Sequence, residues 1–213
     1  MQRALSRCHR RREEITLLAV TKVFPASAIE AAYELGLREF GENYVQEFET
    51  KHPLVRHLED ARFHLIGHLQ SNKARRAAEI FHTIQTVDSV KLARRLDEAA
   101  REQGVTRNTM IEVKLSPEQS KAGTDPSTLP ELMEAIGGCT NLRLTGLMTM
   151  PPWSDDPEQS RPYFRRLREL GERHGIAQFS MGMSHDFEAA IEEGSTCIRV
   201  GTALFGRRVK PAA

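Results

Sequence analysis

The sequence predicts an α/β fold, a single (β/α)8 barrel of the TIM type. Short apolar runs rich in β-branched residues recur along the 213 residues, and amphipathic stretches separate them. That alternation is typical of parallel α/β proteins. The runs number eight, and eight strand–helix units close a barrel. The strand candidates are 15–20, 38–40, 63–67, 82–86, 109–115, 142–148, 177–181 and 196–201.

The intervening helices are marked by their end signals. The stretch 25–35 begins at Pro25 and ends before Gly36, and 88–103 opens on Asp88 as a predicted N-cap. Proline in the first turn and glycine after the last turn are common signals of a helix start and stop. The other helix candidates are 129–136, 160–174 and 184–193, with weaker helices after Asn43 and Ser71.

One domain, residues 1–213, accommodates all these elements. No linker rich in Pro, Gly or Ser and no internal repeat divides the chain. An open doubly wound sheet is the alternative fold, but no GxGxxG motif follows the first strand. Because the chain ends soon after the eighth strand, we expect the segment before Ile15 to cover the seam between the last strand and the first.

Composition argues against several classes of protein. Apolar residues make up 39% of the chain and charged residues 28%, as in ordinary globular domains. A net charge of +1 gives no reason to expect nucleic-acid or membrane binding. The three cysteines lack metal-site or disulfide spacing, and no signal peptide or apolar run of membrane-spanning length is evident. We therefore expect a soluble, cytoplasmic monomer.

Lys22 is the first candidate for chemistry. It stands just after the first strand candidate, and sites in (β/α)8 barrels lie at the carboxyl ends of the strands. Burial there disfavours the ammonium form, so the amine becomes a nucleophile that can form a Schiff base with an aldehyde. The alternative is a strand-end lysine that reaches out to solvent.

The loops after the seventh and eighth strands carry phosphate-binding features. Ser184 is a predicted N-cap of the helix 184–193, where backbone N–H groups suit a phosphate. Gly201 allows close approach of the backbone to a ligand, and Thr202 adds a hydroxyl. Phosphate sites in these barrels frequently lie at these two loops. Two ordinary glycine-containing turns are the alternative.

Three further residues lie near strand ends. Arg199 lies inside the eighth strand on the same face as Gly201. Facing into the barrel, its guanidinium could donate to a ring nitrogen and keep that nitrogen unprotonated, because arginine does not release its proton. A structural ion pair with a glutamate is the alternative. After the second strand, Gly41 is predicted in a tight turn, and Asn43 either caps the next helix or contacts a ligand.

Other residues carry weaker signals. His64 and His68 have the spacing of a metal pair, but no acid or third histidine matches them, so we expect no metal site. Met148, at the end of the sixth strand, is expected in packing or against a bound ring. Lys121 is interpreted as a solvated loop lysine rather than a second cofactor-reactive amine.

Six stretches resemble the YggS/PROSC family of pyridoxal phosphate homeostasis proteins. They are LLAVTKVFP (17–25), REFGENYVQE (38–47), FHLIGHLQSNK (63–73), SKAG (120–123), GLMTM (146–150) and SMGMSHDFEAAIEEGSTCIRVGTALFG (180–206). They cover most of the chain in the order the family has. The resemblance implies a barrel similar to the N-terminal domain of alanine racemase, with pyridoxal 5′-phosphate as the cofactor.

The resemblance also implies which residues hold the cofactor. In this sequence they are Lys22, Asn43, Met148, Ser184, Arg199, Gly201 and Thr202. Among them, Lys22 is expected to carry the Schiff base and Arg199 to face the pyridine nitrogen. The N-terminus departs from the family, because only 14 residues precede the first strand and the family usually has a longer helix there.

Two functions compete for such a site. Racemisation needs acid/base groups on both faces of the substrate carbanion, and alanine racemases take one from a second domain and a partner subunit. This chain ends at residue 213, and its nearest substitutes are Tyr44, His64 and His68. We therefore predict an intracellular carrier of pyridoxal phosphate, with apo enzymes that use the cofactor as partners and no turnover. A racemase-like enzyme is the alternative, and a barrel for another phosphate ligand is a third possibility.

Overall fold

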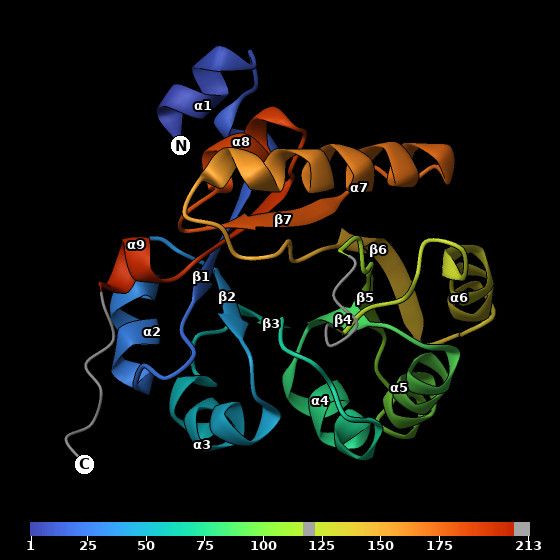
Figure 1. The fold of residues 1–213 in the computed structure, drawn as a ribbon. Coiled ribbons are helices and arrows are strands. Elements are labelled where there is room, and N and C mark those ends of the chain that lie inside the picture. The colour runs from blue at the N-terminus through green and yellow to red at the C-terminus, as the bar shows by residue number, and fades with distance from the viewer. Residues whose placement is uncertain (117–121, 207–213) are drawn as a thin grey trace.

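The computed structural model describes residues 1–116 and 122–206 and has the expected barrel. Within these residues eight parallel strands pair in sequence order, and β8 pairs with β1 to close the ring (Figure 1). Every strand candidate corresponds to one of them. The strands are β1 Thr16–Val20, β2 Glu39–Glu42, β3 Arg62–Leu65, β4 Thr83–Val87, β5 Arg107–Glu112, β6 Leu142–Met148, β7 Phe179–Met183 and β8 Cys197–Val200.

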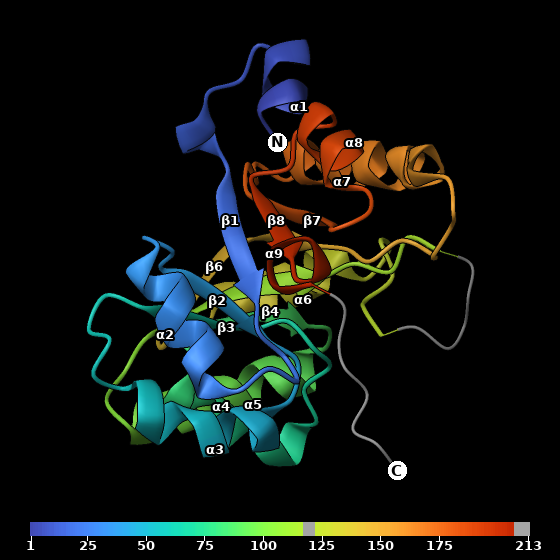
Figure 2. The ribbon, with the colours of Figure 1, turned by 90° about the vertical axis from the view of Figure 1, so that its left-hand side faces the viewer.

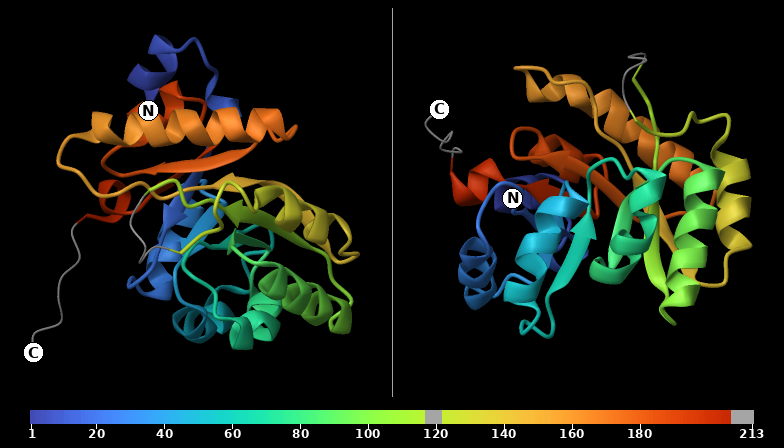
Figure 3. Two further views of the ribbon diagram at one scale, coloured as in Figure 1. Left: turned by 45° about the vertical axis from the view of Figure 1, so that its right-hand side comes forward. Right: turned by 90° about the horizontal axis from the view of Figure 1, so that it is seen from below.

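Helices cover the outside of this ring (Figures 1 and 3). Their apolar faces pack on the outward side chains of the strands in one core, in which the rings of Phe40, Phe48, Phe81 and Phe164 are fully buried. Among the described residues, no helix has the length and apolar character needed to cross a lipid bilayer. The helices are α2 Ala26–Glu34, α3 Val45–Val55, α4 Ala74–Ile80, α5 Val90–Glu102, α6 Leu129–Gly137, α7 Arg161–Arg173, α8 Phe187–Glu192 and α9 Thr202–Phe205, with 3-10 turns η1 Arg12–Glu14, η2 Ser71–Lys73 and η3 Pro157–Ser160.

The N-terminal segment covers the outer face of β8, as expected. Helix α1, Gln2–Arg7, lies beside α8 in both views (Figures 1 and 2). The Arg10 guanidinium donates to the backbone oxygens of Ile191 and Ser195, which ties this segment to the end of α8. A separate apolar cluster joins the segment to the barrel and consists of Ala4, Leu5, Ile15, Ile191, Ile198 and Val200.

The predicted N-caps Asp88 and Ser184 were wrong, and so was the capping alternative for Asn43, because the N-cap of α3 is Tyr44. Helix α5 is capped by Ser89, whose Oγ accepts the N–H of Leu92 at 3.4 Å, so Asp88 lies one residue too early. Helix α8 begins at Phe187, three residues later than expected, and Ser184 is not its N-cap. In both cases the loop between the strand and the helix is longer than the sequence pattern predicted. Helix ends are the least certain part of such predictions.

Gly41 lies inside β2 and not in a tight turn. A Cβ at this position would lie 3.0 Å from Cδ2 of Leu18 and 3.1 Å from Cδ1 of Ile66. Leu18 and Ile66 belong to a small apolar cluster within the ring, together with Val20 and Cys197. The absence of a side chain at Gly41 therefore leaves room for those neighbours, which is a packing requirement and not a conformational one.

Candidate functional site

A cavity of about 250 Å³ lies at the carboxyl ends of the strands. Six of the predicted site residues line it, and they come from the ends of four strands, β1, β2, β7 and β8. They are Lys22, Asn43, Ser184, Arg199, Gly201 and Thr202. Met148 is buried within β6 and is not among the lining residues, whereas Met150, two positions later, is. Lys121 lies outside the described residues.

The turn that carries Lys22 has a strained backbone. Val23, the next residue, has a φ of 61°, in the left-handed region that β-branched residues rarely adopt. The backbone N–H of Val23 donates to the Glu47 carboxylate, and the N–H of Phe24 donates to the backbone oxygen of Thr21 at 3.0 Å. These bonds hold the turn in a conformation that the chain alone disfavours.

A buried ion-pair network anchors this turn from outside the ring. The Glu42 carboxylate is fully buried and accepts from Thr21 Oγ1 at 2.7 Å and from Lys51 Nζ at 3.0 Å. Lys51 also donates to the backbone oxygen of Thr21 at 3.0 Å and to the Glu47 carboxylate at 2.6 Å. Burial raises the pKa of Glu42, and the charge of Lys51 opposes that shift. Because neighbouring residues of a strand face opposite sides, fixing Thr21 and Glu42 outward turns Lys22 and Asn43 toward the cavity.

Ser184 joins the two loops that were predicted to bind phosphate. Its Oγ accepts the backbone N–H of Gly201 at 3.1 Å and that of Ala203 at 3.3 Å. An oxygen that accepts two hydrogen bonds keeps its own O–H to donate. Asp186 holds the start of the same loop, since its carboxylate accepts the N–H of Met183 at 2.7 Å. The contact therefore presents a hydroxyl hydrogen beside Thr202.

Arg199 points into the ring and is 3% exposed. Its Nη1 donates to the backbone oxygen and to Oγ of Ser180, both at 2.7 Å, and its Nη2 donates to the Thr149 oxygen at 2.9 Å. These partners are neutral oxygens, so the alternative of a hydrogen-bonded ion pair with a glutamate is wrong. Burial lowers the pKa of Arg199, but a guanidinium remains charged at neutral pH.

A chain of hydrogen bonds runs from Arg199 across the interior. Ser180 Oγ accepts from Arg199 and donates to Gln85 Oε1 at 2.6 Å. The Gln85 amide nitrogen then lies 2.9 Å from His64 Nδ1, and His64 Nε2 lies 2.6 Å from the Glu39 carboxylate. Because the amide nitrogen can only donate, the chain assigns the His64 proton to Nε2. His64 is therefore a structural residue, and within 1–116 and 122–206 no cluster of potential metal ligands exists.

Sequence reasoning missed Trp153 and His185 at the cavity and Glu112 beside it. Trp153 and His185 line it with ring centroids 4.8 Å apart, and Trp153 is 70% exposed. Trp153 lies in a segment that has no periodic pattern, and His185 directly follows Ser184. Glu112, at the end of β5, lines an adjoining pocket. Burial raises the pKa of Glu112 to about 7, although Arg199 acts in the opposite direction.

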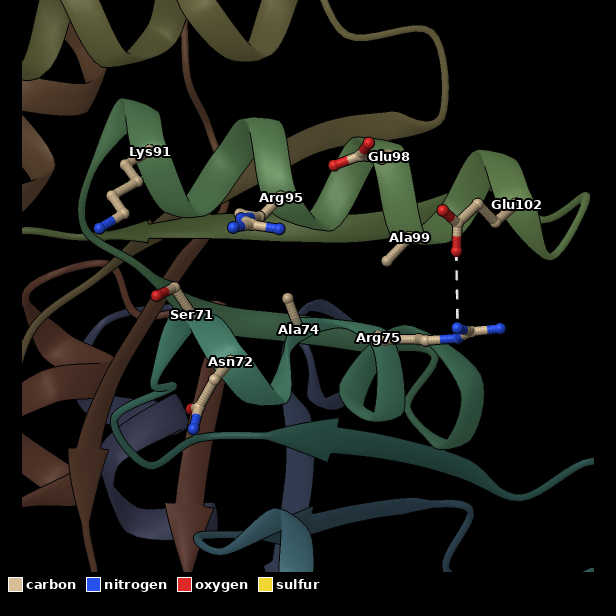
Figure 4. A pocket seen from close by; sticks show the side chains of 9 residues that line it. All are labelled: Ser71, Asn72, Ala74, Arg75, Lys91, Arg95, Glu98, Ala99 and Glu102. Carbon is tan, nitrogen blue, oxygen red and sulfur yellow. Dashed lines mark ion pairs between the residues drawn. The ribbon is translucent and has the colours of Figure 1, made fainter.

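A second hollow lies in the outer layer, between the η2–α4 segment and α5 (Figure 4). Lys91, Arg95 and Glu98 line it from α5, and Arg75 pairs with Glu102 across its end at 3.9 Å. The Arg75 side chain is largely exposed, so this pair adds little stability. The hollow lies between helices and contains none of the predicted site residues.

Comparison with known proteins decides the family. The family model described as alanine racemase, N-terminal domain, matches residues 2–209. The chain belongs to this family. Its relatives include the pyridoxal phosphate homeostasis proteins of Aquifex aeolicus, 40% identical over 98% of this chain and 93% of that protein, and of Escherichia coli strain K12, 43% identical over 96% and 91%. The resemblance to the YggS/PROSC family is thereby confirmed, and these names describe cofactor homeostasis rather than a catalysed reaction.

Solved structures agree with the fold. PipY of Synechococcus elongatus with PLP bound is 40% identical and matches with a TM-score of 0.85 over 96% of this chain and 99% of that one. An alanine racemase from Clostridium difficile matches with a TM-score of 0.73 at 15% identity, over 99% of this chain and 59% of the racemase. The second match concerns the fold alone, and it confirms the alanine-racemase-like barrel.

We predict that Lys51→Met lowers the free energy of unfolding by about 3 to 5 kcal/mol, because it leaves the buried Glu42 carboxylate without its cation. The double variant Lys51→Met/Glu42→Gln should regain part of that loss. Urea unfolding of both variants measures the effect, with the exposed Lys91→Met as the matched control. A Lys51→Met protein as stable as the control would show that the network does not anchor the turn.

We also predict a pH-dependent effect of Glu112→Gln. The pKa of Glu112 is raised in the folded state, so the unfolded chain loses this proton at lower pH and wild-type stability falls as pH rises toward about 7. The variant lacks this loss. Its stability relative to wild type should therefore increase by about 2 to 3 kcal/mol between pH 5 and pH 8. A difference that stays constant over this range in urea unfolding would contradict the raised pKa.

Proposed function

We propose that this chain binds pyridoxal 5′-phosphate in the cavity at the barrel mouth, as a Schiff base on Lys22, and acts as an intracellular carrier of the cofactor. One observation carries the proposal: Lys22, Ser184, Gly201, Thr202 and Arg199 line a single cavity in a member of this family. The PLP-bound structure of PipY, at 40% identity over nearly the whole chain, supports the choice of cofactor.

The donor set suits each part of the cofactor. Lys22 supplies a primary amine, which adds to an aldehyde with loss of water. The Ser184 and Thr202 hydroxyls are suited to donate to phosphate oxygens. Ile66 and Trp153 supply apolar wall against which a flat ring can pack. Asn43 adds a side-chain amide. Its backbone oxygen would lie 2.2 Å from a Cβ at Gly67, so the loop after β3 packs tightly against Asn43.

Arg199 bears on whether the bound cofactor serves catalysis. Pyridoxal phosphate supplies an electron-withdrawing ring that stabilises a carbanion, most strongly when its ring nitrogen is protonated. A permanently charged donor facing that nitrogen favours the unprotonated ring, because arginine has no proton to give up. The buried Arg199 in this cavity therefore favours holding the cofactor over carbanion chemistry.

The lining residues also favour a carrier. Of the groups considered for a second base, His64 is engaged inside the ring, and Tyr44 and His68 are largely exposed and do not line the cavity. His185 does line it and is the residue that a racemase-like enzyme would use. Apo enzymes that need the cofactor are the proposed recipients.

Borohydride reduction of the purified protein should attach a pyridoxyl group to Lys22, and peptide mass spectrometry would locate it. The Lys22→Ala variant should be colourless and unlabelled, while Lys91→Ala should retain the adduct. A dominant adduct on another lysine would make the assignment of Lys22 wrong. Exchange of the Cα hydrogen of alanine with solvent deuterium, faster than with free cofactor and lost in His185→Gln, would favour the enzyme.

Replacement of Ser184 or Thr202 by alanine should weaken cofactor retention by about tenfold each, since each change removes a hydrogen bond to a charged phosphate. The Schiff base should still form at high cofactor concentration, because Lys22 is unchanged. Retention is measured as the rate at which apo enzyme or dialysis removes the cofactor. Ser6→Ala, in helix α1, is the control, and unchanged retention in both site variants would remove these residues from the phosphate site.

A further inference from the structure

A second pocket of about 250 Å³ adjoins the cofactor cavity. The two share Met150, Trp153 and Met183 as a common wall. The far wall of the second pocket is the chain that continues from β5, where Glu112, Lys114 and Ser116 line it. None of these three residues has a role in the proposed binding of the cofactor.

The three polar residues stand at alternate positions of the segment 112–116. The N–H of Lys114 donates to the backbone oxygen of Thr124 at 2.9 Å, and the N–H of Thr124 donates to the backbone oxygen of Glu112 at 2.8 Å, so the backbone from Glu112 to Lys114 is held in an extended form beyond the end of β5. Ser116 follows at a bend. Alternate residues of an extended chain face the same side, which applies to Glu112 and Lys114. With Ser116, a carboxyl, an ammonium and a hydroxyl group line the same pocket.

Two of these groups each have a buried oxygen that makes no hydrogen bond to the described residues. Glu112 is 3% exposed and Ser116 is 8% exposed. Within 1–116 and 122–206, the Glu112 Oε2 and the Ser116 Oγ make no hydrogen bond. Buried polar side chains nearly always have partners, because an unsatisfied one loses the hydrogen bonds it made to water. Two such atoms on one pocket indicate a ligand that supplies the missing partners.

We propose that this pocket binds a free α-amino acid, with its ammonium group on Glu112 and its carboxylate on Lys114 and Ser116. A simple amine would leave Lys114 unmatched, and a simple carboxylic acid would leave Glu112 unmatched. A zwitterion satisfies both, and Met150, Pro151 and Trp153 surround its side chain with apolar surface. The position of the amino acid beside the cofactor rests on the proposed function, whereas its binding to the pocket does not.

The test uses L-leucine and two analogues that each lack one charge. 4-Methylpentanoate lacks the ammonium group, and 3-methylbutylamine lacks the carboxylate. Calorimetry and the fluorescence of Trp153, the single tryptophan of the sequence, report binding. Two protein forms are used: one with the cofactor locked by borohydride, so that amines cannot react with it, and the Lys22→Ala variant. L-leucine should bind both forms, and each analogue should bind at least about tenfold more weakly.

Variants locate the binding. Glu112→Gln and Lys114→Met should each weaken L-leucine binding by about tenfold or more. Glu98→Gln and Lys91→Met, at the hollow between α4 and α5, carry the same chemical changes and should have no effect. Absence of L-leucine binding up to about 10 mM would overturn the proposal. So would loss of binding in the control variants, or unchanged binding in Glu112→Gln.

The outcome is separable from that of the proposed function. If no adduct forms on Lys22, the Lys22→Ala protein still reports L-leucine binding, because that form carries no cofactor on this residue. If L-leucine fails to bind, the borohydride adduct on Lys22 is unaffected. A change in cofactor retention in Glu112→Gln, without any L-leucine binding to wild type, would assign Glu112 to the cofactor and overturn the amino-acid site.

Discussion

The interior of this barrel is organised by one buried guanidinium. Arg199 lies inside the ring with its hydrogen bonds directed to neutral oxygens of Ser180 and Thr149. A buried charge is costly unless its donors are satisfied, and the polar groups beside Arg199 satisfy them. Ser180, Gln85 and His64 continue the chain of hydrogen bonds to Glu39 near the other end of the ring, where a carboxylate ends it. The positive charge itself stays at the cavity, where it favours an anionic ligand.

A second buried charge set lies on the outer side of the strand ends. Glu42 and Lys51 pair between β2 and α3, and Glu47 extends the pair to the backbone of Val23. The two charge sets face opposite sides of the same strands. The outer one restrains the turn between β1 and α2, and the inner one gives the cavity its charge. Lys22 lies between them, on a strained backbone that local sequence preference would not choose.

The two pockets at the mouth divide the chemistry between them. The cofactor cavity gathers hydroxyl groups, an amide, an amine and a guanidinium, which suit an anionic aromatic aldehyde. The adjoining pocket has a carboxyl and an ammonium group in sequence along one wall, which suit a zwitterion. Met150, Trp153 and Met183 form the wall between the two pockets. Trp153 lines both of them and is largely exposed to solvent. The proposed amino acid would therefore lie beside the cofactor.

Much of this architecture is readable in the sequence. The eight apolar runs and their intervening amphipathic stretches determined the barrel, because parallel strands buried on both faces leave a continuous hydrophobic signal. Lys22, Ser184, Arg199, Gly201 and Thr202 were identified from their places at strand ends, which a barrel brings to one mouth. The i,i+4 spacing of Glu47 and Lys51 is also visible along the chain. That Lys51 pairs with the buried Glu42 as well is not visible there.

The tertiary structure decided what depends on contacts between distant segments. Ser184 was predicted as a helix cap, but its oxygen instead accepts from Gly201 and Ala203, because the loop after β8 lies against it. The isolation of Glu112 and Ser116 follows from packing around them and has no signature in a run such as IEVKLS. The sequence by itself determined the strand order and the candidate residues through local pattern. Burial, partner choice and the pocket walls were decided by tertiary structure, because they depend on segments far apart in the chain.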